Sequence, residues 1–223
     1  MHVVVTGASG ALGKTVCRHL LAVGAAVTGI DLLEPSDPDP RLTMQISDVD
    51  LADAASVEAA VSTIAAGGHQ VTGLVNVAGG FAWETIMEGD PASWDRMWTM
   101  NVKTALNMSR AVIPHLQDGT SSIVNIGAGA AAKAAMGMGA YAASKSGVAR
   151  LTEALAEELK PRRIRVNAVL PSIIDTEANR SDMPDADFSA WVTREELAHV
   201  IGFLLSEAAS GVTGALLPVS GRV

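Results

Sequence analysis

Tyr141 and Lys145 are the residues of this chain whose types and spacing most directly suggest chemistry. They lie four positions apart in an alanine-rich run that predicts a helix from residue 141 to 160. Residues at this spacing project from one helix face, one turn apart. Because a cation favours the phenolate, we expect Lys145 to lower the pKa of Tyr141 toward neutral and the pair to act as an acid and base. Tyrosine and lysine at this spacing also occur on ordinary solvated helices, so the pair indicates catalysis only if a cofactor site lies beside it.

The segment from Thr6 to Gly13 supplies a candidate cofactor site, because it joins a predicted strand to a predicted helix. Glycines there permit a tight turn and let the backbone approach a pyrophosphate at the helix N-terminus. The alternative is a glycine-rich turn that binds nothing. The predicted contacts of this loop with a dinucleotide are Gly7, Ser9, Gly10, Ala11, Leu12 and Gly13.

Asp31 ends the second predicted strand, eighteen positions beyond Gly13. An acidic residue at this place binds the ribose hydroxyls of adenosine and repels a 2′-phosphate, so we expect NAD(H) rather than NADP(H). Lys14 could instead pair with such a phosphate, but we interpret it as a solvated residue of the first helical turn.

Composition narrows the class of protein. The chain has 223 residues, 48% of them hydrophobic, which fits one globular α/β domain over residues 1–223. A net charge of −8 argues against a nucleic-acid partner. The single cysteine, Cys17, cannot form an internal disulfide and is expected to be a small buried side chain. The histidines are scattered without metal-ligand spacing, so we expect no metal.

Targeting signals are also not expected. No apolar run reaches the roughly 18 residues that a membrane span requires. The chain starts on an apolar strand, which leaves no room for a signal or transit peptide. We therefore expect a cytoplasmic protein without a membrane partner.

Strands alternate with helices along the chain, which predicts parallel βαβ units in a doubly wound sheet with helices on both faces. In such sheets ligands bind at the carboxyl ends of the strands. The polar stretch 172–192 is the longest candidate for a mobile loop. The predicted strands are 2–6, 26–30, 42–46, 71–77, 122–126, 164–170 and 215–219, and the predicted helices are 11–23, 51–66, 90–116, 139–160 and 193–205.

The glycine loop, Asp31 and the Tyr141–Lys145 pair together resemble the short-chain dehydrogenase/reductase family, over essentially the whole chain. The resemblance implies a Rossmann-type three-layer α/β/α sandwich with a mostly parallel seven-stranded sheet. It also implies that Asn101 is catalytic and holds a water that connects Lys145 to solvent. The cofactor contacts that it implies are Asp48, Val49, Asn76, Ala78, Gly79, Tyr141, Lys145, Pro171 and Thr176.

Ala128 departs from the family pattern. The family's catalytic serine usually lies thirteen positions before the tyrosine, where this chain has Ala128. Losing such a hydrogen-bond donor to the reacting oxygen commonly costs about 10²–10³ in rate. Ser144 and Ser172 are possible replacements, although Ser144 lies on the helix and can point elsewhere.

A narrower resemblance, to quinoid dihydropteridine reductases, accounts for this departure. These enzymes use NADH, keep the tyrosine and lysine, and lack the serine. Residues 77–81 are similar to their strand-four exit and residues 183–191 to their substrate-side loop. The resemblance implies hydride transfer to a small planar carbonyl or quinonoid substrate, with Tyr141 as proton donor. A quinonoid ring is already electron-poor, so it need not be polarised by a serine.

Aromatic residues are scarce, yet three of them fall in loops near the predicted strand ends. A flat substrate would stack on such rings, whereas ordinary loop packing is the alternative. The predicted substrate contacts are Phe81, Trp83, Ala128, Met138 and Trp191.

Trp94 and Trp98 lie four apart on a predicted helix, and we expect them in the core. The long helices 91–116 and 139–160 carry more small apolar surface than one domain needs. In the family that this chain resembles, such helices pair across a two-fold axis, so we expect a homodimer or a homotetramer.

The alternative hypothesis is a function without catalysis: the chain would be an NAD(H)-binding sensor or partner protein whose active site is impaired by Ala128. The presence of Tyr141, Lys145 and Asn101 weighs against it, because a protein that only binds has little use for an acid and base pair.

Overall fold

The computed structural model describes all residues from Met1 to Val223. Seven strands form one sheet in the order β3-β2-β1-β4-β5-β6-β7, and every neighbouring pair is parallel. The predicted doubly wound sheet is therefore confirmed. The direction of winding reverses between β1 and β4, which makes their carboxyl ends the switch point. The strands are β1 (His2–Thr6), β2 (Ala26–Ile30), β3 (Met44–Ile46), β4 (Gly73–Asn76), β5 (Ser122–Ile126), β6 (Arg165–Pro171) and β7 (Leu216–Val219).

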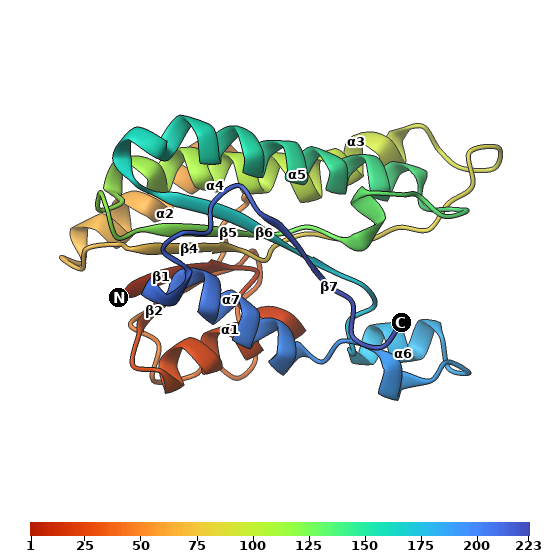
Figure 1. Cartoon of the computed structure of the whole chain (residues 1–223), viewed down its shortest axis with the longest axis horizontal. Helices are drawn as coiled ribbons and strands as arrows, with labels where there is room; N and C mark the ends of the chain where they lie inside the picture. Colours follow the sequence, from red (N-terminus) through yellow and green to blue (C-terminus); the bar gives the residue numbers. More distant parts are fainter.

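Helices cover both faces of the sheet, as Figure 1 shows. One layer contains α1 and α7, and the other contains α2, α4 and α5. The α-helices are α1 (Ala11–Ala22), α2 (Ala54–Ala66), α3 (Ala92–Trp98), α4 (Thr104–Val112), α5 (Gly139–Leu159), α6 (Glu177–Asp182) and α7 (Arg194–Leu205). A π-helical segment spans Thr99–Lys103, and short 3₁₀ turns span Ile113–His115, Gly129–Ala131, Lys160–Arg162, Phe188–Ala190 and Glu207–Ala209. No helix combines the length and the apolarity that crossing a lipid bilayer requires.

Two apolar cores hold these layers together, one on each face of the sheet. Val3, Val4 and Val5 of β1 are fully buried, because helices cover both faces of a parallel sheet. Cys17 is buried in the core between α1 and the sheet, as expected, and burial raises the pKa of its thiol to about 12. A capping box formed by Thr193 and Glu196 begins α7, in agreement with the helix predicted over residues 193–205.

The predicted helix over residues 90–116 contains a π-helical segment, and this corrects the placement of two tryptophans. Uninterrupted α periodicity would place Trp98 on the same face as Ala105 and Val112, which are buried. The segment Thr99–Lys103 inserts about one extra residue and rotates α3 by roughly 100° relative to α4. Trp94 and Trp98 are consequently 45% and 52% exposed, so the prediction that they belong to the core was wrong.

The stretch 172–192 is more ordered than its composition predicted. It contains α6, which begins with the Thr176 side chain accepting a hydrogen bond from the Asn179 backbone. Arg180 forms a two-bond ion pair with Asp175 and lies over the ring of Phe188, 4.8 Å from its centre. These contacts are polar and local, and α6 is too short to show an apolar period, so the pattern did not reveal it.

Candidate active site

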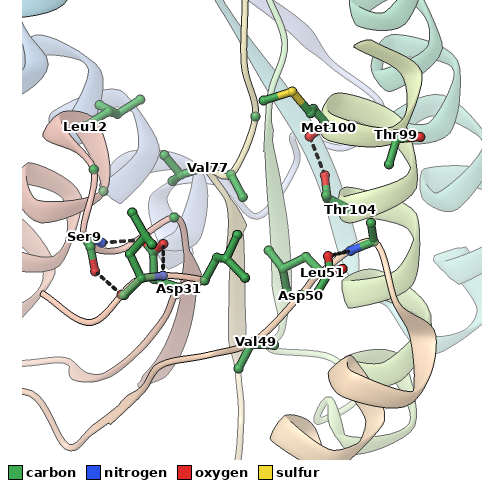
Figure 2. Close-up of a pocket in the computed structure, with 18 of the residues that line it drawn as sticks. Ser9, Leu12, Asp31, Val49, Asp50, Leu51, Val77, Thr99, Met100 and Thr104 are labelled. Atoms are coloured by element: carbon green, nitrogen blue, oxygen red, sulfur yellow. Dashed lines mark hydrogen bonds between the residues drawn. The ribbon is translucent and has the colours of Figure 1, made fainter. Parts of the chain in front are cut away.

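A cavity of about 650 Å³ opens at the carboxyl ends of β1, β2 and β4 (Figure 2). Its size lies within the range of small-molecule and cofactor sites. Ser9 and Asp31 lie on one side of it, and Met100 and Thr104 lie on the other. The predicted cofactor contacts that line it are Gly7, Ser9, Gly10, Ala11, Leu12, Gly13, Asp31, Val49, Ala78 and Gly79.

The glycine loop is shaped by close backbone contacts. Gly7 has a φ of +62°, and a Cβ there would lie 2.9 Å from the Ala78 backbone nitrogen. A Cβ on Gly13 would lie 2.0 Å from the Gly7 carbonyl oxygen. Only glycine fits either position, and the loop therefore rests directly on the exit of β4. Gly10, which precedes α1, provides no side-chain cap, so backbone N–H groups of the first turn remain available for an anion.

Asp31 is fixed at the lip of the cavity by two backbone amides. Its Oδ2 accepts from the Ser9 N–H at 2.8 Å, and its Oδ1 accepts from the Leu33 N–H at 3.2 Å. Figure 2 shows the Ser9–Asp31 contact. Each carboxylate oxygen has a second lone pair, which leaves acceptor capacity for hydroxyl groups of a ligand.

Lys145 and Tyr141 project together from the first turns of α5, as the spacing predicted. The Lys145 ammonium is buried and donates to the Ile126 carbonyl at 2.9 Å, and it lies 5.9 Å from the centre of the Tyr141 ring. Burial lowers the pKa of Lys145 to about 8 and raises the pKa of Tyr141 to about 12. The expectation of a lowered tyrosine pKa is thus wrong for the protein alone, because desolvation outweighs the cation. The phenol is protonated at neutral pH, as a proton donor must be.

Asn101 lies in the π-helical segment and turns its amide toward the exit of β4. Its Nδ2 donates to the Gly80 carbonyl at 3.1 Å and to Ser144 Oγ at 3.0 Å, and its Oδ1 accepts from the Gly80 N–H at 3.0 Å. A Cβ on Gly79 would lie 2.6 Å from Asn101 Oδ1 and 3.5 Å from Lys145 Nζ. Asn101 and Lys145 therefore meet at Gly79, at the edge of the cavity.

Of the predicted substrate contacts, Phe81 lies beside Tyr141 and Trp83 lies beside the loop that precedes α5. Phe81, which is 53% exposed, packs edge-on against the Tyr141 ring at 4.9 Å between ring centres. Trp83 covers the backbone of Gly137, where a Cβ would lie 2.1 Å from the indole. Ala128 is buried after β5, and Met138 is half-buried directly before α5.

The hydroxyls considered as replacements for the serine are both engaged. Ser144 Oγ donates to the Tyr141 carbonyl at 2.7 Å, and Ser172 Oγ donates to the Ser220 carbonyl at 2.8 Å. Neither donor is free to bind a substrate oxygen.

Several predicted site residues do not line the cavity. Asn76 is buried beneath it and donates to Ser109 Oγ and Asn125 Oδ1. Trp191 is 3% exposed and packs on Phe188, so it cannot stack on a substrate here. The other predicted site residues outside the lining of the cavity are Asp48, Phe81, Trp83, Asn101, Ala128, Met138, Tyr141, Lys145, Pro171 and Thr176. Of these, Asn101 and Lys145 adjoin the cavity at Gly79.

The cavity also has walls that the sequence reasoning did not assign. Leu32 and Leu33 directly follow Asp31 and could have been inferred from that position. Thr99, Met100 and Thr104 reach the cavity from the π-helical segment and α4. In the sequence, the π-helical segment could be detected only as a shift of one residue in the helical spacing of the buried positions. The remaining unassigned lining residues are Asp50, Leu51, Ala52 and Val77.

Comparison with known proteins gives one consistent family. Residues 1–187 match the family described as short chain dehydrogenase. The chain is 32% identical, over 98% of its length, to the 3-oxoacyl-acyl-carrier-protein reductase FabG of Pseudomonas aeruginosa, covering 95% of that protein. It superposes on the aldohexose dehydrogenase of Thermoplasma acidophilum with a TM-score of 0.90 and 26% identity, covering 99% of this chain and 92% of that one. It also superposes on carveol dehydrogenase from Mycobacterium avium in complex with NAD, with a TM-score of 0.85 and 27% identity, covering 99% and 96% of the two chains.

Proposed function

This chain belongs to the short-chain dehydrogenase family of oxidoreductases, and from that membership we propose that it reduces a small planar carbonyl or quinonoid substrate with NADH. The observation that carries the proposal is the place of the Tyr141 phenol, which packs against the exposed ring of Phe81 and projects from α5 together with the buried Lys145 ammonium. An acid beside an aromatic surface suits a flat electron acceptor. We further propose that the substrate class is like that of dihydropteridine reductases.

NADH is favoured over NADPH by the carboxylate of Asp31, which the Ser9 and Leu33 amides hold at the lip of the cavity. A 2′-phosphate would face this charge, whereas two ribose hydroxyls would donate to it. The uncapped start of α1 suits the pyrophosphate. Carveol dehydrogenase, which is similar in fold, is a precedent for a member of this fold in complex with NAD. A cytoplasmic location stays a prediction of the sequence.

Each residue of the site has a distinct task in the proposed reaction. The nicotinamide supplies the hydride when the cofactor is bound. Tyr141 donates its hydroxyl proton to the substrate oxygen or nitrogen that gains electrons. Lys145 would bind the nicotinamide ribose and stabilise the tyrosinate left after proton transfer. Its pKa of about 8 keeps most of the amine protonated at neutral pH. Asn101 would hold the water through which the pair is reprotonated.

Ala128 explains the preference for an electron-poor substrate. Reduction of an ordinary ketone is faster with a second donor on its oxygen beside the Tyr141 hydroxyl, and the buried methyl group of Ala128 offers none. A quinonoid ring gains aromatic stabilisation on reduction and depends less on that donor.

The function is tested by following NADH absorbance with quinonoid dihydropterin, simple benzoquinones and aliphatic ketones as acceptors. We expect turnover of quinonoid acceptors and little turnover of ketones. Turnover confined to aliphatic ketones would contradict the proposed substrate class. Tight NADH binding with no turnover of any acceptor would contradict the proposed reaction and favour the sensor alternative.

Restoring the hydroxyl in an Ala128→Ser variant should raise kcat/KM for ketones by about tenfold or more, because one oriented donor to a developing oxyanion is worth about 10²–10³ in rate. The rate with quinonoid acceptors should change little. Ala132→Ser, on an exposed position of the same loop, serves as the control. Equal effects on ketones and quinones would show that Ala128 does not set the substrate class.

The exposed tryptophans of α3 support the proposal that the protein forms a homodimer, or a homotetramer built from such dimers. Trp94 packs beside Gly139 and Trp98 beside Gly147, so both indoles flank α5 while about half of each remains exposed. Large half-exposed aromatic side chains over small residues are typical of protein–protein interfaces.

We expect Trp98→Glu to shift the protein to a smaller species in sedimentation velocity, because a buried unpaired carboxylate opposes association. Val23→Glu introduces the same charge at an exposed apolar position at the end of α1 and should leave the assembly intact. An unchanged sedimentation coefficient for Trp98→Glu would exclude this face as the interface.

A further inference from the structure

Ser144 forms the only side-chain hydrogen bond between Asn101 and α5. Its side chain is 1% exposed, its Oγ accepts from Asn101 Nδ2 at 3.0 Å, and it donates to the Tyr141 carbonyl at 2.7 Å. We propose that Ser144 is a positioning residue that fixes the first turn of α5, and with it the Tyr141 phenol, on Asn101. This inference rests on the proposed function, because it assigns a role in the reaction of Tyr141.

The direction of these hydrogen bonds is determined by chemistry. An amide NH₂ can only donate and a carbonyl oxygen can only accept, so the Ser144 hydroxyl must accept from Asn101 and donate to Tyr141. The same bonds fix the orientation of the Asn101 amide, because its Oδ1 then accepts from the Gly80 N–H. A continuous chain of hydrogen bonds thus links the exit of β4, the π-helical segment and the start of α5.

The start of α5 needs such an attachment because its N-terminus is not capped. Met138 precedes the helix and makes no side-chain capping bond, and Gly137 before it has a φ of +75°. Tyr141 is only the third residue of the helix. The N–H groups of this first turn have no intrahelical acceptors, so the turn is held weakly. A displacement of about 1 Å at a reacting group can cost about 10²-fold in rate. Ser144 therefore affects the reaction rate indirectly, by fixing the position of the Tyr141 phenol.

Thr152 provides a matched comparison on the same helix. It is fully buried, its Oγ1 donates to the Val148 carbonyl at 2.8 Å, and it accepts from Asn125 Nδ2 at 2.9 Å. Both hydroxyls thus connect a buried asparagine amide to a carbonyl of α5. Thr152 makes no hydrogen bond to Asn101, Tyr141 or Lys145, so removing its hydroxyl costs a comparable interaction without touching the reacting residues.

The test compares Ser144→Ala with Thr152→Val in the full-length protein, with quinonoid dihydropterin as the probe. Both variants should lose a similar amount of thermal stability. Only Ser144→Ala should lower kcat, by about tenfold to a hundredfold, with the Kd for NADH within about twofold of wild type. Its solvent deuterium isotope effect on kcat should also rise, because proton transfer from a displaced phenol becomes more rate-limiting. Ser144→Cys, which keeps a weak donor and acceptor, should recover part of the rate.

Three results would overturn the inference: a kcat for Ser144→Ala within about twofold of that for Thr152→Val, an unchanged isotope effect, or a parallel loss of NADH affinity. If wild-type protein reduces no acceptor, the proposed function fails and hydrogen exchange decides the inference. Faster exchange of the Gly80 amide and of the first turn of α5 in Ser144→Ala, but not in Thr152→Val, would support it. Unchanged exchange in Ser144→Ala would overturn it.

Discussion

Replacing Tyr141 by phenylalanine is expected to lower kcat by about 10²–10⁴-fold, the usual contribution of a positioned general acid. The phenol is the proposed proton donor, because burial keeps it protonated at neutral pH and the Lys145 ammonium is assigned to the nicotinamide ribose. A phenylalanine ring retains the edge-on contact with Phe81, so the fold of the site should not change. NADH oxidation with quinonoid dihydropterin gives kcat, and NADH fluorescence gives the Kd, which should stay within about twofold of wild type.

Phe81→Leu is the control for the Tyr141 variant, since it removes the neighbouring ring and keeps the acid. It should raise KM for a flat substrate more than it lowers kcat, because it removes a binding contact. A Tyr141→Phe variant with full activity would end the assignment of the proton donor. A parallel loss of NADH affinity would instead mean that Tyr141 serves mainly to bind the cofactor.

Asp31→Asn is expected to reduce the preference for NADH over NADPH by about 10²-fold, measured as the ratio of kcat/KM for the two cofactors. The substitution removes the charge that opposes a 2′-phosphate. It also costs affinity for NADH, because both carboxylate oxygens accept backbone N–H bonds and an amide has only one acceptor oxygen. Either the Ser9 or the Leu33 amide then loses its partner. The kcat values at saturating cofactor should change much less than the affinities.

Asp50→Asn tests whether any negative charge in the cavity has the same effect. Asp50 also lines the cavity, and its carboxylate accepts from the Ala52 N–H at 2.8 Å. Asp50 does not follow β2, so we expect the Asp50→Asn variant to keep the ratio of kcat/KM for NADH and NADPH within about twofold of wild type. Equal effects of the two variants would indicate a general electrostatic field rather than recognition of the ribose by Asp31.

Features that depend on local spacing could be predicted from the sequence. The glycine loop and Asp31 each end a buried strand, and parallel strands bring their carboxyl ends to one edge, so their meeting at the cavity follows from topology. The shared face of Tyr141 and Lys145 follows from helical geometry alone.

Features that depend on burial in three dimensions could not be predicted in this way. The pKa of Tyr141 is set by how much water the fold removes, and no spacing reports that quantity. Trp191 was assigned to a substrate contact because it falls in a loop near the predicted strand ends, yet it is buried and packs on Phe188. The double role of the Ser144 hydroxyl depends on the π-helical segment, which brings Asn101 within reach of α5.

The π-helical segment Thr99–Lys103 has a consequence for how this helix can vary. The residues before the segment and those after it present faces to the rest of the protein that differ by a rotation about the helix axis. The extra residue in the π-helical segment supplies that rotation. Loss of one residue there would restore a single phase, so the helix would satisfy either its upstream contacts or its downstream contacts but not both. One solution would bury the indoles and the other would turn the Asn101 amide away from Gly80. Among relatives, a change of length at this place should therefore alter assembly and chemistry together, whereas substitutions can change them separately.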